Sequence, residues 1–230
     1  MRITLQHMSA FLITLTLFGA PSWQHLNAQI RTRIGVNAGI NFANQTHSFP
    51  GFDFSTSTRT GLTLGGIVEL SISDLWRIQI EPRYIQKGMK VPGIVVTIGQ
   101  SPEPVGTIDA IDRLDYFEIP LQLKAISTPA DIRFFGYLGP SVGFLLTAKE
   151  TAEGYPTPGY TDTTRDITSF FNNIDFSLDA GGGAEFRISP DVSLYADARY
   201  SHGLVNISDS DIITTKSYGF QMHIGALFDL

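Results

Sequence analysis

The feature that most constrains this chain is a set of eight segments with an apolar/polar period of two, joined by connections of alternating length. The segments are Arg31–Phe42, Arg59–Leu70, Leu75–Lys87, Arg113–Ala125, Ile132–Thr147, Ile174–Arg187, Val192–Gly203 and Lys216–Asp229. Short connections lie at residues 71–74, 127–131 and 189–191, and long ones at 43–58, 88–112, 149–173 and 204–215. A period of two predicts strands rather than helices.

Tight turns at one end of a sheet and long loops at the other are typical of barrels in the bacterial outer membrane. We therefore predict an all-β fold: a closed antiparallel up-and-down transmembrane β-barrel of about eight strands, with short periplasmic turns and long extracellular loops. Closure is required because an open sheet would leave backbone N–H and C=O groups unpaired in hydrocarbon.

The N-terminus indicates export. Arg2 precedes an apolar run, Ala10–Ala20, and a small residue stands at Ala28. This order predicts a cleaved signal peptide at residues 1–28, followed by a barrel domain at residues 29–230 and placement in the cell outer membrane. The alternative is an uncleaved anchor helix, but the apolar run is shorter than the roughly 20 residues that span a bilayer.

Composition excludes several classes of function. The chain has no cysteine, so a disulfide framework, a thiolate metal site and a cysteine nucleophile are excluded. Removal of residues 1–28 takes away Arg2 and no acid, which leaves 15 basic against 22 acidic residues and a formal charge of −7. An acidic chain without a basic patch argues against a nucleic-acid partner.

Side-chain parity places most charged residues of the segments on one face, because successive strand side chains point to opposite faces. Seven basic and seven acidic residues share it: Arg33, Arg77, Arg83, Lys87, Lys124, Arg187, Arg199, Glu69, Glu81, Glu118, Asp175, Asp179, Glu185 and Asp197. Glycines 35, 39, 65, 181 and 183 lie on the same face and would make room for long side chains. Because an eight-stranded barrel has room inside only for side chains, we predict a structural charge network that fills the lumen.

Parity alone does not say which face is outside. A soluble eight-stranded barrel of the lipocalin type would turn the apolar face inward around a ligand cavity. The long segments, the alternating connections and the glycines on the polar face favour the membrane barrel, because a solvent-exposed face gains nothing from glycines that weaken a strand.

Four stretches carry a family resemblance: Tyr116–Lys124 (YFEIPLQLK), Gly136–Pro140 (GYLGP), Ala180–Glu185 (AGGGAE) and Ala198–Ile207 (ARYSHGLVNI). They resemble the PorT-like outer-membrane β-barrel family of Bacteroidota, over nearly the whole mature chain. The resemblance implies an outer-membrane barrel of about eight strands. Its founding members are linked to protein secretion by the type IX system, and most relatives have no assigned role.

Several polar residues are candidates for catalysis or metal binding. Ser201 and His202 are adjacent, so in a regular strand they point to opposite faces and cannot form a nucleophile and base pair. His223 has lumen parity, which favours a hydrogen-bond network, and His47, in the first long connection, has no repeated metal-ligand spacing. Asp209 and Asp211 near His202 fit a solvated loop better than a protease-like rim. We predict no catalytic residue, no metal and no cofactor.

The sequence favours a non-enzymatic outer-membrane barrel, structural or accessory to envelope processes such as protein secretion. Expected partners are outer-membrane lipid, the barrel-assembly machinery and an envelope or secretion protein. The alternatives are a surface binding or adhesion protein that uses its long extracellular loops and, third, an enzyme that acts on lipid or peptide.

Overall fold

The computed structural model describes residues 31–48, 56–97, 104–128, 130–154, 161–210 and 212–230. The predicted signal peptide, residues 1–28, lies outside them. The strands are β1 (Thr32–Ser48), β2 (Arg59–Ser71), β3 (Trp76–Ile80), β4 (Arg83–Thr97), β5 (Pro104–Ile126), β6 (Ile132–Gly154), β7 (Thr163–Asp166), β8 (Ile174–Arg187), β9 (Val192–Gly203) and β10 (Thr214–Asp229), and a 3-10 helix η1 spans Thr168–Phe170. Among the described residues, no helix has both the length and the apolar character that a membrane-spanning helix needs.

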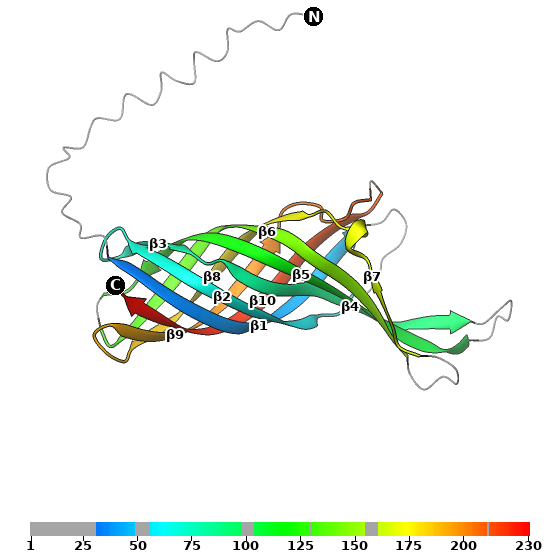
Figure 1. Ribbon diagram of the computed structural model, residues 1–230, viewed down its shortest axis with the longest axis horizontal. Helices are drawn as coiled ribbons and strands as arrows, with labels where there is room; N and C mark the ends of the chain where they lie inside the picture. The colour runs from blue at the N-terminus through cyan, green and yellow to red at the C-terminus, as the bar shows by residue number, and fades with distance from the viewer. Residues whose placement is uncertain (1–30, 49–55, 98–103, 129, 155–160, 211) are drawn as a thin grey trace, which may run out of the picture.

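These strands form one antiparallel sheet that closes on itself (Figure 1). The first strand pairs with the last, β1 with β10, and β5 pairs with β6, so the ring has no free edge along the wall of the barrel. Strands β3 and β4 share one position, because both pair with β2 on one side and with β5 on the other. The ring therefore has eight positions, occupied by β1, β2, β3 with β4, β5, β6, β8, β9 and β10. The prediction of a closed barrel of about eight strands is confirmed.

The third predicted segment, Leu75–Lys87, is divided in two by Glu81 and Pro82. Proline has no N–H to donate to a neighbouring strand, so a ladder that reaches it is interrupted. The chain bridges the gap with backbone bonds on both sides, from the Gly66 N–H to the Pro82 carbonyl and from the Glu81 N–H to the Pro120 carbonyl. The wall thus remains hydrogen-bonded across the break.

The two ends of the barrel differ as expected. The three short turns and both ends of the described chain lie at one end, here called the short-turn end, and the long connections lie at the other, the long-loop end (Figure 1). Strands β4, β5 and β6 run further than predicted and project past the barrel at the long-loop end. Their pairing continues to Thr97 opposite Pro104 and Ile108 opposite Gly154.

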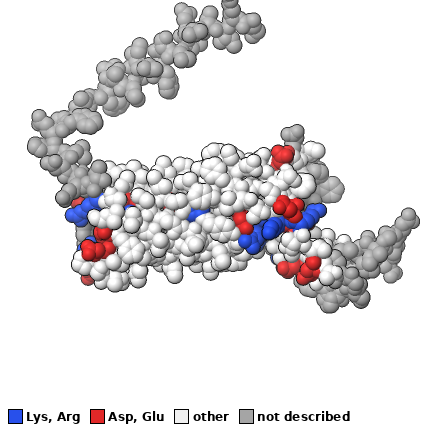
Figure 2. Space-filling model, in the orientation of Figure 1, with Lys and Arg blue, Asp and Glu red and all other residues white. Residues whose placement is uncertain are grey.

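The outer wall is apolar, and most of the side chains that face the interior are polar. Neighbours on β5 show the alternation, since Leu121 is 48% exposed and Gln122 only 1%. On the visible face of the barrel the middle is almost free of charge, and Lys, Arg, Asp and Glu gather at the two ends (Figure 2). This arrangement excludes the lipocalin-type alternative, in which the apolar face would line the interior.

Candidate functional site

The centre of the lumen holds a group of buried ion pairs that we call the central cluster. Its members are Glu81, Arg83, Lys87, Glu118, Asp175, Asp179, Asp197 and Arg199. Arg83 binds Glu118 at 2.5 Å and Asp179 at 3.1 Å. Glu118 lies opposite Arg83 on the neighbouring strand β5, whereas Asp179 lies on β8, so the Arg83–Asp179 pair spans the lumen and occupies its cross-section.

Further contacts extend the central cluster along the barrel axis. Lys87 binds Glu118 at 2.8 Å and Asp175 at 2.9 Å. Arg199 binds Glu81 at 2.7 Å. His223, predicted to join a hydrogen-bond network, does so through its Nδ1, which lies 2.8 Å from a carboxylate oxygen of Asp197.

A second group of ion pairs, the short-turn cluster, lies closer to the short-turn end. Glu69 accepts from Arg33 at 2.5 Å, from Arg77 at 2.7 Å and from Lys124 at 2.8 Å. Glu185 accepts from Arg33 at 2.5 Å and also pairs with Arg133. The cluster therefore holds four basic side chains against two carboxylates.

The structure places thirteen of the fourteen predicted lumen residues in buried positions, and Arg187 is the exception. Strand β8 ends at Arg187, so its side chain leaves the lumen at the rim and is exposed. Arg133, which parity reasoning did not assign, takes its place beside Glu185. With this exchange the two clusters together still hold seven basic and seven acidic residues.

Apolar side chains share the interior at the short-turn half, which sequence reasoning missed. They are Ile67, Ile126, Phe135, Tyr137, Tyr195 and Leu227. The Tyr137 hydroxyl donates to Asp197 at 2.9 Å and accepts from Arg199 Nε at 2.9 Å. In β6 both parities carry aromatic residues, so alternation could not show that Phe135 and Tyr137 face inward.

The long-loop end is closed by a second apolar group. Its buried members are Ile85, Leu114, Tyr116, Ala148, Ile167 and Ile207. Ile167 lies next to η1, and Ile207 follows β9 in the last long connection. The two connections hold each other, because the Asn172 side-chain amide donates to the carbonyls of Asn206 and Ser208 at 3.1 and 2.9 Å. The charge network is thus covered by apolar side chains toward the long-loop end.

Glycines provide room for the lumen side chains, as predicted. A Cβ built on Gly181 would lie 2.6 Å from the Tyr137 hydroxyl, and one on Gly39 would lie 2.6 Å from the His223 ring. The added Cβ atoms would also lie 2.6 Å from the Ala198 carbonyl oxygen and 2.3 Å from the Met222 carbonyl oxygen, respectively. None of these approaches is tolerable for two non-bonded heavy atoms, so a larger residue would displace the aromatic ring and strain the pairing with the neighbouring strand.

We expect Gly181→Ala to lower the free energy of unfolding by about 1–3 kcal/mol, because overpacking moves Tyr137 away from Asp197 and Arg199. Urea titration of the barrel in lipid vesicles measures this change. The matched control is Gly136→Ala on the outer wall, where the nearest atom to an added Cβ is 3.7 Å away. Equal losses in the two variants would contradict the role of Gly181.

The candidate catalytic residues do not assemble into a site in the described residues. Ser201 is buried inside the barrel and His202 is exposed outside, so they lie on opposite faces as predicted. His47 does not lie in a loop as expected, because β1 continues to Ser48. Its ring contacts the Thr215 hydroxyl at 3.0 Å and the Met89 sulfur at 2.9 Å. Asp209 donates its N–H to the Phe170 carbonyl, and Asp211 lies outside the described residues.

A small cavity of about 290 Å³ opens beside the projecting strands at the long-loop end. Asp112 lines it and faces Glu150 across the β5–β6 pairing. Arg113, the next residue, is exposed on the outer wall and marks the end of the apolar band, so Asp112 lies beyond the membrane-spanning part. Burial and the negative charge of Glu150 raise the pKa of Asp112 from 3.8 to about 6, and Arg165 opposes this shift.

The raised pKa of Asp112 predicts that the stability of the projecting parts of β4, β5 and β6 depends on pH. The folded state holds a proton on Asp112 below about pH 6, whereas the unfolded chain releases it near its ordinary value, so the stabilisation is lost as the pH rises through 6. We expect amide hydrogen exchange in the parts of β4, β5 and β6 that project past Asp112 at the long-loop end to speed up between pH 5 and pH 8. The increase should exceed the one that the intrinsic, structure-independent exchange rate shows over the same pH range. Asp112→Asn should remove the excess, whereas Asp74→Asn at the short-turn end should leave it. An unchanged excess in Asp112→Asn would contradict the prediction.

Known proteins resemble this chain in sequence family and in architecture. The family model of the outer membrane protein beta-barrel domain matches residues 24–209. Among solved structures, Neisserial surface protein A is 12% identical with a TM-score of 0.43, over 84% of this chain and 95% of that one. OprG from Pseudomonas aeruginosa is 11% identical with a TM-score of 0.45, over 87% and 97%. The outer membrane protease OmpT from Escherichia coli is 10% identical with a TM-score of 0.46, over 87% and 97%. No curated protein sequence matches the chain.

Proposed function

Because the chain belongs to the family of outer membrane protein beta-barrel domains and lies in the outer membrane, we propose that it is a non-enzymatic barrel with a closed lumen. It serves the envelope as a structural or accessory protein rather than as a pore. The short-turn end then faces the periplasm and the long-loop end faces outward.

The observation that carries this proposal is the filled interior. Arg83 and Arg199, near the middle of the barrel, are each 1% exposed and bind carboxylates from other strands. A continuous aqueous path would need the space that these paired side chains occupy. The apolar group around Ile167 and Ile207 adds a second barrier at the outer end.

Conductance measurement tests the closed lumen directly. We expect the purified barrel in a planar bilayer at neutral pH to give no stable ion current. The variant R83M/E118M, which lacks both charges but keeps most of the side-chain volume, should also give no stable current, because the methionines still fill the cross-section. Large, reproducible channels in the unmodified protein would contradict the proposal.

The finer proposal is an accessory role in protein secretion, shared with PorT-like barrels. Its support is the resemblance of Tyr116–Lys124, Gly136–Pro140, Ala180–Glu185 and Ala198–Ile207 to that family. Deletion of the gene in its native host should reduce the amount of secreted protein, and the full chain should restore it. Secretion that is unchanged by the deletion would remove this role and leave the structural one.

The second candidate is a surface binding protein. It is favoured by the projecting part of β4, β5 and β6, which exceeds what closing a barrel requires. In a protein of this kind, shortening the β4–β5 hairpin by removal of residues 92–107 should abolish attachment of whole cells to a surface ligand. In the structural protein it should alter neither attachment nor insertion into the membrane.

The proposed absence of catalysis rests on the placement of the polar candidates. Ser201 and His202 lie on opposite faces, and His223 is 2% exposed and engaged with Asp197. Incubation of the purified barrel with lipid A and with peptide substrates should leave both intact. Turnover that disappears in His202→Ala would replace this proposal with the third candidate, an enzyme at the outer surface.

A further inference from the structure

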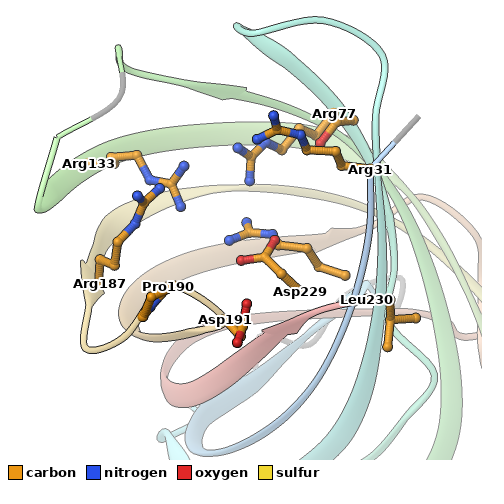
Figure 3. Close-up of a pocket in the computed structure, with 10 residues that line it drawn as sticks. Arg31, Arg77, Arg133, Arg187, Pro190, Asp191, Asp229 and Leu230 are labelled. Carbon is orange, nitrogen blue, oxygen red and sulfur yellow. The ribbon is translucent and has the colours of Figure 1, made fainter. Parts of the chain in front are cut away.

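Five arginines surround a cavity of about 470 Å³ at the short-turn mouth of the barrel (Figure 3). They are Arg31, Arg33, Arg77, Arg133 and Arg187, and the other lining residues are Ser71, Pro190, Asp191, Asp229 and Leu230. The geometry points to a binding site for a phosphate-type oxyanion in this mouth. Neither the family nor the closed lumen calls for such a site.

The inner part of the mouth is already partly neutralised. Arg33, Arg77 and Arg133 belong to the short-turn cluster and bind Glu69 and Glu185. Even with these two carboxylates counted beside Asp191 and Asp229, the five arginines remain in excess, and Lys124 adds a further positive charge behind them. The inner part therefore provides a positive floor fixed by buried contacts.

The outer part of the mouth supplies two exposed cations. Arg31 and Arg187 are exposed, and no carboxylate of the described residues lies within ion-pair distance of either. The guanidinium groups of Arg77, Arg133 and Arg187 approach the opening from separate strands, whereas Asp191 lies below them in the view and Asp229 toward the middle of the mouth (Figure 3). The basic groups thus outline one part of the cavity, in which an anion is held away from Asp191.

Guanidinium groups select the class of ligand. Their planar forks donate two parallel hydrogen bonds to phosphate or carboxylate, and a concave site with low-dielectric walls strengthens the attraction. Several forks around one cavity favour an anion with many acceptor oxygens and more than one charge, and phosphate groups have both. In the periplasm such a group is available from small phosphate anions and from phospholipid headgroups of the inner leaflet.

The experiment compares binding of pyrophosphate to the folded full-length barrel in neutral detergent micelles, measured by titration calorimetry. The test variant is R31Q/R187Q, which removes the two exposed arginines outside the ion-pair clusters. The matched control is R113Q/R165Q, which removes the same charge from exposed arginines toward the long-loop end. In a second arm, native mass spectrometry counts the phosphatidylglycerol retained from mixed nanodiscs.

We expect R31Q/R187Q to weaken pyrophosphate binding by about tenfold or more, since a charge-assisted hydrogen bond from each arginine contributes substantially to affinity. The control should bind like the unmodified barrel. If pyrophosphate does not bind but phosphatidylglycerol is retained and is lost from R31Q/R187Q, the site is supported and its source is the lipid headgroup. Binding that is equal in both variants, or no binding of either probe, overturns the site. Tighter binding of a glutamate-rich peptide than of pyrophosphate overturns the assignment to phosphate.

Discussion

Replacing Arg83 with methionine is expected to lower the free energy of unfolding by about 3–5 kcal/mol, because removal of one partner leaves buried carboxylates uncompensated. Arg83 is 1% exposed and binds Glu118 and Asp179, which are both 0% exposed. Methionine preserves most of the volume, so the loss of stability reports charge rather than a cavity. Urea titration in lipid vesicles measures it.

Two comparisons separate this effect from a general loss of fit. Arg165→Met removes an exposed arginine paired with Glu150 at 3.0 Å, and an exposed pair is worth less than about 1 kcal/mol. Adding Asp179→Asn to Arg83→Met should recover part of the stability, because without Arg83 the nearest cation to the Asp179 carboxylate is Arg199 at 3.8 Å. The interpretation fails if Arg83→Met and Arg165→Met cost the same.

The second large effect is expected on the outer wall. Leu121 lies near the middle of the barrel wall and is 48% exposed, so Leu121→Arg places a charge in hydrocarbon and should lower the free energy of unfolding by about 2–4 kcal/mol. The same change at Ile132, the first residue of β6 at the short-turn rim, should cost about 0–1 kcal/mol, because arginine there reaches the headgroups. Refolding into vesicles followed by urea titration gives both values.

A barrel wall in a membrane differs from a water-exposed one in that the cost of an added arginine depends on its depth in the bilayer. If Leu121→Arg and Ile132→Arg have equally small effects, the outer face does not contact hydrocarbon. Leu121→Met serves as the control for packing, because it keeps the side chain apolar and should change stability by less than about 1.5 kcal/mol.

Much of the fold could be predicted from sequence because the two features that determine it, the apolar/polar alternation and the length of the connections, are local in the chain. Alternation assigns Leu121 and Gln122 to opposite faces without knowledge of any partner strand, and the short connections identify which strands are neighbours. The length of β4, β5 and β6 was less accessible, because beyond the membrane no apolar band requires a strand to end. Pro82 indicates an irregularity in its strand, but the exact pairing around it depends on Gly66 and Pro120, which are distant in sequence.

The lumen was predictable in composition but not in its contacts. Charge and parity identified thirteen buried members, because a charged residue in a membrane strand is stable only when it faces inward. The prediction for Arg187 was wrong because parity assigns a face to every residue of a strand, whereas the enclosed lumen ends before the last residue of β8. Arg133 was missed because its neighbours Phe135 and Tyr137 are aromatic on the inward face, and only the three-dimensional packing shows that these rings sit among charges.

The division of charge between the two clusters gives the barrel an electric polarity along its axis. The short-turn cluster has four bases against two acids, and the central cluster has three bases against five acids, so positive charge dominates toward the periplasm and negative charge toward the outside. A cation that approaches from the periplasm and an anion that approaches from outside each meet repulsion of their own sign. Loosened packing alone would therefore not make the barrel conduct salt, because an electrostatic barrier to each ion would remain after the steric one had gone.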